Sequence, residues 1–530
     1  MSKAEFTAAQ GGSVWTPDLG DGTFQNPIVH ADYSDPDVIR VGADFYMTAS
    51  SFSHVPGLPI LHSKDLVNWT IISYAIDRLV LPGYELPQHG KGVWAPSLRY
   101  HDGKFWIYFG APDEGIYMTT AVDPRGPWTP LHRVKEVKGW IDTCPLWDED
   151  GQAYLVHAFA HSRSGIKHKL QVCKMSQDGK TLLDDGVIVF DGTVSHPTLE
   201  GPKIYKRNGY YYLFAPAGGV PTGWQLILRS RSIYGPYEEK IVLHQGDSII
   251  NGPHQGGWVE LESGESWFIH FQDKEAYGRI AHLQPVQWVD DWPLMGVDTN
   301  GDGIGEPVLR ATKPDVGGSW PVAVPATTDH FDSDRLGLQW QWQANPQDNW
   351  YSLKEKPGYL RLHASALPDG VDTLYGAPQL LMQKFPAEVF TVTAKAELHA
   401  VHSAEQAGLI VFGYTYGSLS LQQSDEGMRV VMLLGEAVND SVNEQVEASV
   451  LLNIASGPIY LRVAVTENAN CQFSYSTDGE EFQSIGSSFK AREGRWVGAK
   501  VGLYALGGLG SKEAEAASVG YADFDWIVFE

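Results

Sequence analysis

Alternating apolar and polar positions recur along the first three hundred residues in five similar stretches. Each stretch consists of a short strand, a polar turn with a glycine, and a second strand rich in aromatic residues, such as "KFWIYF". Alternation with a period of two predicts β-strands rather than helices. The five stretches begin at Asp35, Ala95, Cys144, Gly201 and Gly256.

The spacing of these stretches predicts the architecture. Their turn glycines are about 50 to 60 residues apart, a period typical of propeller blades. In several units a second strand pair follows, as in "QLILRSRSIYGPYEEKI". Two hairpins make a four-stranded blade, so the pattern predicts a five-bladed β-propeller whose first strands line a central channel. The turn glycines are Gly42, Gly103, Gly151, Gly209 and Gly264.

Beyond residue 310 the pattern changes. Residues 311–328, "ATKPDVGGSWPVAVPATT", predict an ordered linker because they are rich in proline, glycine and threonine. From 329 to 530, short alternating segments such as "FTVTAKAELHA" predict an antiparallel β-sandwich. The expected fold is therefore all-β, with a propeller domain over 1–310 followed by a jelly-roll-like sandwich domain.

Two roles compete for the sandwich. It could bind polysaccharide as a separate module, or it could pack on the propeller and restrict the channel mouth with a loop. The short linker is not a flexible Gly/Ser tether, which favours packing. The segment "LYALGGLGSKEAEAA", which starts at Leu503, is the candidate loop.

Composition narrows the range of partners. A formal net charge of −25 argues against nucleic acid, since such binding depends on clustered lysine and arginine. The 18 tryptophans suit flat, neutral ligands such as sugars. The 3 cysteines lack metal-site spacing. No apolar run resembles a signal peptide or a membrane span, so we expect no membrane partner and a cytoplasmic protein, or a secreted one if a leader was removed. The acidic surface is compatible with a monomer or a homo-oligomer.

Three carboxylates stand where first strands begin. Asp35, Asp142 and Glu200 each lie within three residues before the proline that opens the first strand of their unit. First strands line the channel, so we expect the three acids to converge at one end of it. Trp94 of the second unit is expected at the position matching Glu200.

Glycoside hydrolysis has a use for three acids. One carboxyl donates a proton to the leaving oxygen, a second activates water or attacks carbon, and a third raises the pKa of the donor by repulsion. A single acid at a strand start is more often a turn cap, but three at similar places favour catalysis. The alternative of another class is a sugar-binding protein without catalysis, which would lack an acid or a base.

Five motifs together resemble glycoside hydrolase family 43, in particular β-xylosidases and α-L-arabinofuranosidases with a C-terminal concanavalin-like domain. The resemblance covers essentially the whole chain. It implies an inverting reaction in which Asp35 is the general base, Glu200 the general acid and Asp142 the residue that tunes the pKa of the acid. The motifs are "NPIVHADYSDPDVIRVGADFYMTASSF", "GVWAPSLRYHDGKFWIYF", "IDTCPLWDEDGQAYLV", "LEGPKIYKRNGYYYLF" and "GPHQGGWVE".

The resemblance implies further site residues. Arg279 would bind the terminal sugar, with a structural ion pair as the alternative. Phe52 and Trp94 would form aromatic walls, with ordinary blade packing as the alternative. His254 would contact a central calcium ion through water, with a buried, hydrogen-bonded histidine as the alternative, because calcium prefers oxygen ligands.

A second calcium signal is weaker. "DTNGDGIGEPV" from Asp298 begins like a calcium loop, but its twelfth position is Leu309 instead of a bidentate glutamate. A tight polar turn is the favoured interpretation. No cofactor is expected to be required, and a structural calcium ion stays open.

The expected function is that of an exo-acting inverting glycosidase that releases terminal β-D-xylose from xylo-oligosaccharides, with α-L-arabinofuranosidase activity beside it. The alternative is an enzyme that mainly removes arabinose from decorated polysaccharide fragments. Sequence does not rank the two, because about 1 to 3 kcal/mol of pocket contacts reverses such a preference.

Overall fold

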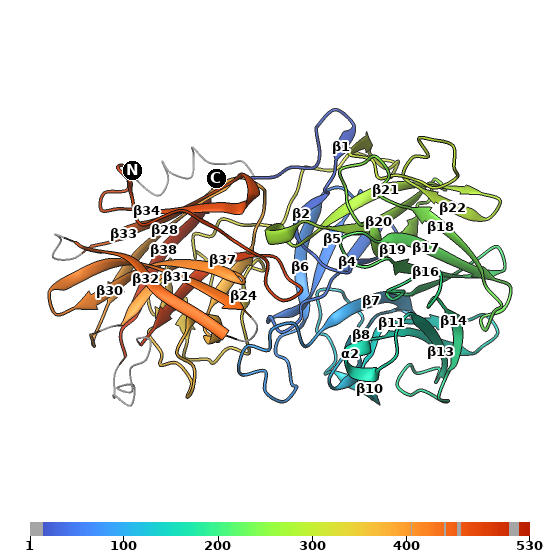
Figure 1. The fold of residues 1–530 in the computed structure, drawn as a ribbon, viewed down its shortest axis with the longest axis horizontal. Helices are drawn as coiled ribbons and strands as arrows, with labels where there is room; N and C mark the ends of the chain where they lie inside the picture. Colours follow the sequence, from blue (N-terminus) through green and yellow to red (C-terminus); the bar gives the residue numbers. More distant parts are fainter. Residues whose placement is uncertain (1–13, 404, 439–440, 453–456, 508–518) are drawn as a thin grey trace.

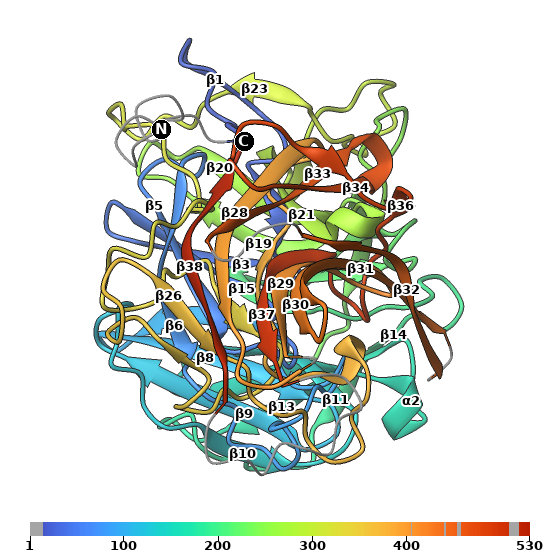
Figure 2. The ribbon, with the colours of Figure 1, turned by 90° about the vertical axis from the view of Figure 1, so that its left-hand side faces the viewer.

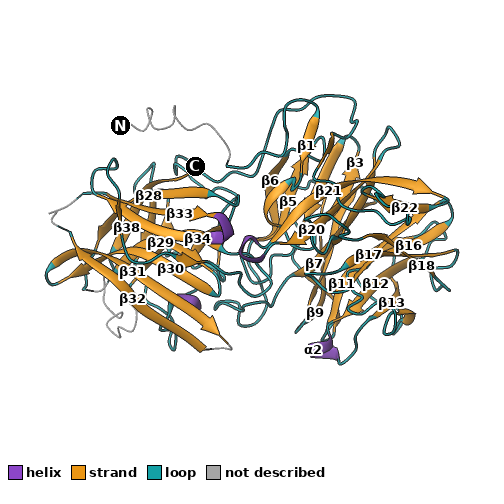
Figure 3. Cartoon of the chain, turned by 45° about the horizontal axis from the view of Figure 1, so that its top comes forward, coloured by secondary structure: helices purple, strands orange, loops and turns teal. Residues whose placement is uncertain are grey.

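Two β-rich domains lie side by side in the computed structural model, which describes residues 14–403, 405–438, 441–452, 457–507 and 519–530 (Figure 1). Strands and loops make up nearly all of both domains (Figure 3). The all-β prediction of a propeller followed by a sandwich is confirmed. The residues from 508 to 518, which include most of the predicted sandwich loop, lie outside the described part of the chain.

Within residues 14–403, the first four propeller blades are four-stranded antiparallel sheets built from consecutive strands. The predicted turn glycines have φ between 62° and 89°, a left-handed conformation that glycine adopts without strain. The strands of the four blades are β3 (Asp37–Val41), β4 (Asp44–Thr48), β5 (Gly57–Ser63) and β6 (Trp69–Ile76); β7 (Trp94–His101), β8 (Lys104–Ala111), β9 (Gly115–Ala121) and β10 (His132–Glu136); β11 (Trp140–Trp147), β12 (Ala153–Phe159), β13 (Lys169–Met175) and β14 (Val187–Asp191); and β15 (Lys203–Arg207), β16 (Tyr210–Ala217), β17 (Trp224–Ser230) and β18 (Glu238–Leu243).

The fifth blade combines the two ends of the propeller domain. Strand β2 (Val29–Asp32) pairs with the first part of β21 (Arg279–Val289), while β22 (Trp292–Met295) pairs with its second part. The other strands of this blade are β19 (His254–Glu260) and β20 (Ser266–Asp273). This pairing closes the ring of blades. A further ribbon joins β1 (Thr23–Gln25) to β23 (Arg310–Thr312).

Helices are short throughout the described residues. They comprise α2 (His161–Ser164) and the single-turn helices η1 (Glu275–Tyr277), η2 (Leu374–Gly376) and η3 (Glu467–Ala469). In the described part of the chain, none of them is long or apolar enough to cross a membrane.

The C-terminal domain is a sandwich of two antiparallel sheets, which lies in front of the propeller in Figure 2. In β33 (Ile459–Thr466) the inward residues are buried and alternate with partly exposed ones, as the sequence pattern predicts. In the described residues one sheet has the order β24 (Gln341–Trp342), β27 (Leu381–Lys384), β37 (Lys500–Leu506), β29 (Gln406–Phe412), β30 (Thr415–Ser424), β31 (Gly427–Val438) and β32 (Ser441–Leu451). The other has the order β25 (Tyr351–Ser352), β26 (Leu360–His363), β38 (Tyr521–Phe529), β28 (Phe390–His399), β33 (Ile459–Thr466), β34 (Asn470–Ser476) and β35 (Gln483–Ser484), with β36 (Phe489–Lys490) beside β34.

The two domains share one hydrophobic core. Val55 and Tyr277 of the propeller belong to the same buried cluster as Trp342 and Phe385 of the sandwich. Burial of apolar area on this scale is the main favourable term in domain association. The sandwich is therefore packed on the propeller and is not a tethered module.

Asn345 makes a polar connection across this interface. Its side-chain oxygen accepts the Leu79 N–H at 2.9 Å, and its amide donates to the Leu79 carbonyl at 2.8 Å. Both groups are buried, so loss of the amide leaves the backbone of Leu79 unsatisfied.

Replacing Asn345 with alanine should destabilise the protein by about 1 to 3 kcal/mol because two buried backbone groups lose their partners. Calorimetry should show a Tm lower by about 2 °C or more. Asp348→Ala, which alters an exposed residue nearby, is the control and should leave Tm unchanged. Equal Tm values for the two variants would contradict the interpretation.

Candidate active site

A residue with left-handed backbone recurs at the channel end of the first strand of each blade. In blades 2, 3 and 5 the strand ladder is irregular at the same place. Positive φ is uncommon outside glycine and is concentrated at functional sites. The residues, with their φ values, are Asp35 (53°), Ala95 (33°), Asp142 (58°), Gly201 (60°) and Gln255 (56°).

This conformation gives a common reference for the blades. Asp35 and Asp142 occupy equivalent positions, whereas Glu200 stands one residue earlier, before Gly201. Trp94 and His254 take the place of Glu200 in blades 2 and 5. The sequence suggested counting back from the proline of each first strand, which places the three acids at unequal distances from it. The left-handed residue, and not the proline, marks the equivalent position in each blade.

Asp35 is held by donors on both oxygens. Its Oδ2 accepts hydrogen bonds from the hydroxyls of Ser34 at 2.7 Å and Ser50 at 2.6 Å. Its Oδ1 accepts one from Nη1 of Arg279 at 3.1 Å. Ser50 is in turn fixed by the N–H of Ala95, which donates to its hydroxyl at 2.7 Å. This set of donors is complementary to an ionised, oriented carboxylate.

Glu200 lies in a contrasting environment. Burial, and after it the negative charges of Asp142 and Asp35, raise the pKa of its carboxyl to about 8. No described residue donates a hydrogen bond to this carboxyl. Burial also raises the pKa of Asp142, against the opposing effect of the Gly201 N–H, which donates to its Oδ2 at 2.8 Å. The raised pKa of Glu200 favours its protonated form near neutral pH, as a general acid requires.

Arg279 at the start of β21 faces the same acids. Besides Asp35, its Nη1 bonds the Ser34 hydroxyl at 2.7 Å. Among the described residues, none accepts a hydrogen bond from its Nη2 or Nε. The ion pair and the sugar-binding role, predicted as alternatives, are therefore compatible, because one edge of the guanidinium holds Asp35 and the other keeps its donors for a ligand.

Aromatic rings line the neighbouring wall. The Phe52 and Trp94 rings lie 6.3 Å apart at 64°. Trp496 of the sandwich lies 6.3 Å from Trp94 at 72°, and the Arg279 guanidinium lies 5.7 Å from the Trp496 ring. The second domain therefore contributes an indole, 41% exposed, to the wall.

Trp496 was not predicted from the sequence as a site residue. It belongs to residues 493–498 between β36 and β37, not to the predicted segment after Leu503, whose residues 508–518 are outside the described part. The signal available was "GRWVG", an aromatic residue between Gly494 and Gly498. Nothing in this local pattern says that the segment contacts the other domain.

His254 is the first residue of β19 and is 1% exposed. Burial lowers its pKa to about 3, so the ring is neutral, and it packs on Phe271 at 5.2 Å. Its Nδ1 has no hydrogen-bond partner among the described residues. Those residues also contain no group of three or more histidine, cysteine, aspartate or glutamate side chains that could hold a metal ion.

The loop at Asp298 is a polar turn. Its two carboxylate oxygens accept the N–H groups of Gly301 at 2.7 Å and Gly303 at 2.9 Å. Asp302 likewise accepts the Ile304 N–H at 2.8 Å. The carboxylates of the loop are thus hydrogen-bonded to backbone N–H groups of the same turn.

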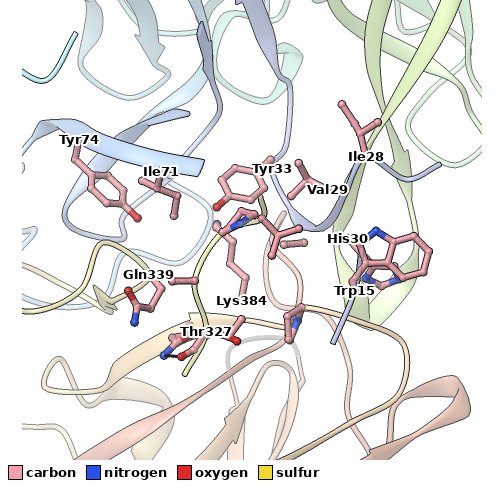
Figure 4. A pocket seen from close by; sticks show the side chains of 16 residues that line it. Trp15, Ile28, Val29, His30, Tyr33, Ile71, Tyr74, Thr327, Gln339 and Lys384 are labelled. Carbon is pink, nitrogen blue, oxygen red and sulfur yellow. Dashed lines mark hydrogen bonds between the residues drawn. The ribbon is translucent and has the colours of Figure 1, made fainter. Parts of the chain in front are cut away.

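Several cavities lie along the domain interface. One of about 280 Å³ is lined by Arg279 and Trp496 together with Val220 and Tyr414. Another, of about 50 Å³, is drawn in Figure 4 and is lined by both domains. It contains none of the predicted site residues, so its location gives it no part in the chemistry of the acids. Its lining residues include Trp15, His30, Tyr33, Tyr74, Gln339 and Lys384.

Two family models match the two domains of the chain. The model of glycosyl hydrolases family 43 matches residues 24–293, and that of the beta xylosidase C-terminal concanavalin A-like domain matches residues 328–530. A Formosa agariphila protein named beta-xylosidase is 33% identical, covering 99% of this chain and 93% of its own. A Bacteroides ovatus protein named non-reducing end alpha-L-arabinofuranosidase is 30% identical, covering 96% and 95%.

A solved structure is similar over the same length. The xylan beta-1,4-xylosidase of Bacillus halodurans superimposes with a TM-score of 0.82 and 25% identity, covering 96% of this chain and 99% of that one. Both domains are thus shared with this group of proteins. The chain belongs to glycosyl hydrolase family 43 and is a glycosidase.

Proposed function

We propose that the protein is an exo-acting, inverting glycosidase that releases terminal β-D-xylose from xylo-oligosaccharides, with α-L-arabinofuranosidase activity beside it. The observation that carries the proposal is the contrast between Glu200, whose pKa is raised, and Asp35, whose oxygens are hydrogen-bonded. The names of the β-xylosidase and α-L-arabinofuranosidase relatives support both sugars.

In the proposed mechanism the two acids act on opposite sides of the bond. Asp35 accepts a proton from a water molecule as that water attacks the anomeric carbon. Glu200 donates its proton to the glycosidic oxygen as the bond to the leaving group breaks. The configuration inverts in one displacement, and Glu200 ends ionised while Asp35 ends protonated. Burial and, after it, repulsion by Asp142 keep Glu200 protonated.

The wall of the site supports exo action on a small sugar. Phe52, Trp94 and Trp496 offer apolar faces, and Arg279 offers free donors for hydroxyl groups. Because Trp496 comes from the second domain, the wall extends over the side of the channel mouth, which favours binding of a chain end.

Initial rates on nitrophenyl β-D-xylopyranoside and nitrophenyl α-L-arabinofuranoside, measured side by side, test the proposal. A dominant xyloside rate supports it. A dominant arabinofuranoside rate replaces it with the arabinofuranosidase alternative. Absence of both activities overturns it in favour of a sugar-binding protein.

Glu200→Ala should lower kcat on xylobiose by about a hundred- to ten-thousand-fold, the usual contribution of a general acid. The loss should be much smaller on a nitrophenyl xyloside, whose leaving group needs little protonation. Glu480→Ala, at an exposed position of the sandwich, is the control. Equal losses on both substrates would contradict the assignment of Glu200.

The pH dependence follows from the raised pKa of Glu200. The acid must be protonated, so kcat/KM should fall as pH rises through about 8. Asp142→Asn removes a negative charge, lowers the pKa of Glu200, and should move this alkaline limb to lower pH by about one unit. A pH profile of kcat/KM for both proteins measures the shift. An unmoved limb, or one moved to higher pH, would show that Asp142 does not tune the acid.

We propose further that a structural calcium ion binds near the axis within a shell of water molecules, since the described residues offer no cluster of direct side-chain ligands, and that Nδ1 of His254, which has no partner among the described residues, contacts this shell. Removal of the ion with EDTA should lower Tm by about 2 °C or more, since a ligand that binds the folded state stabilises it. EDTA saturated with calcium is the control. An unchanged Tm would contradict the proposal.

A further inference from the structure

Asp32 is the last residue of β2, the strand that closes the propeller ring. It pairs with Ile280 of β21, next to Arg279, and is 4% exposed. A buried carboxylate needs hydrogen bonds or opposite charges to offset its loss of hydration. Its partners come from both domains.

Each carboxylate oxygen of Asp32 accepts a hydrogen bond from a different domain. Oδ1 accepts the backbone N–H of Arg279 at 2.9 Å. Oδ2 accepts the backbone N–H of Gly498 at 3.0 Å. Gly498 lies two residues after Trp496, so a single carboxylate joins the arginine that bonds the base to the sandwich segment that carries the indole.

The backbones around this carboxylate approach too closely for side chains. A Cβ on Gly278 would lie 2.6 Å from Oδ1 of Asp32, and a Cβ on Gly498 would lie 2.7 Å from the Gly278 nitrogen. Directly beyond, the Ala499 N–H donates to the Ala276 carbonyl at 2.7 Å. The two segments are therefore docked backbone to backbone with Asp32 between them.

Two buried lysines of the sandwich interact electrostatically with the carboxylate of Asp32. Lys384 and Lys500 pair across β27 and β37. Burial lowers the pKa of both lysines, and Asp32 opposes this effect at each of them. Lys384 also lies beside Tyr33, the residue after Asp32, with its ammonium 5.1 Å from the ring, as Figure 4 shows for these two side chains.

We propose that Asp32 is a positioning residue that fixes Arg279 relative to Trp496, so that the sugar-binding wall is complete only when the sandwich is docked. The inference rests on the proposed function, because its readout is turnover of a xyloside. Asp32 itself touches neither substrate nor reacting atoms. It acts through the backbone of residues on each side of the site.

Asp32→Asn is the decisive variant. The amide keeps the size of the side chain but has one acceptor oxygen, so one of the two N–H donors faces an NH₂ group. We expect KM for nitrophenyl xyloside to rise about tenfold with kcat within about threefold of the native value, since a binding contact is loosened and Asp35 and Glu200 are retained. Asn345→Ala, which weakens the interface elsewhere, should lower Tm without this rise in KM.

A double-mutant cycle separates positioning from general damage. In a Trp496→Ala background the indole is already absent, so Asp32→Asn should raise KM by much less than in the native background. Gly498→Ala keeps Asp32 but forces the two backbones apart, and it should reproduce the rise in KM even if Asp32→Asn folds poorly.

Three outcomes would overturn the inference: equal KM increases with and without Trp496, a lower Tm with unchanged KM in Asp32→Asn, or a native KM in Gly498→Ala. An inactive native enzyme would instead overturn the proposed function, so the two failures are distinguishable.

Discussion

Pairing of β2 with β21 is the constraint on which the site depends. It joins the start of the propeller domain to its last blade, and it brings Asp35 within 3.1 Å of Arg279, although 244 positions separate them in the chain. The other acids come from blades whose places in the ring are fixed only once the ring is closed. Without this pairing the channel would have an open edge, and the base would lose its arginine partner.

Two carboxyls of similar intrinsic acidity acquire opposite roles through their surroundings. Asp35 receives three hydrogen bonds, which fix the orientation of its carboxyl group. Glu200 receives none from the described residues, and burial beside two negative charges favours its protonated form. The difference arises from the strand starts. Asp35 and Asp142 are the left-handed residues of their blades and so occupy equivalent positions. Glu200 comes one residue before the left-handed residue of its own blade, Gly201.

Local pattern was sufficient to predict the blades, their turn glycines and the sandwich, because strand alternation and left-handed turns are short-range properties. The three acids could be predicted to lie together because they stand close to strand starts that repeat. The offset of Glu200 was not visible, since a proline in the sequence does not reveal which residue adopts positive φ. Trp496 and Asp32 were missed for a different reason: their significance lies in contacts between segments that are hundreds of residues apart, and neither has a distinctive local motif.

The order of the sandwich strands has a consequence for biosynthesis. β38, the last strand of the chain, lies between β26 and β28 inside its sheet. That sheet therefore cannot be completed until β38 has been synthesised, whereas every strand of the propeller precedes it in the chain. During this interval the propeller surface that later joins the common core, including Val55 and Tyr277, is uncovered. The nascent chain thus exposes an apolar face until β38 is made, and such a transiently exposed surface is prone to aggregation.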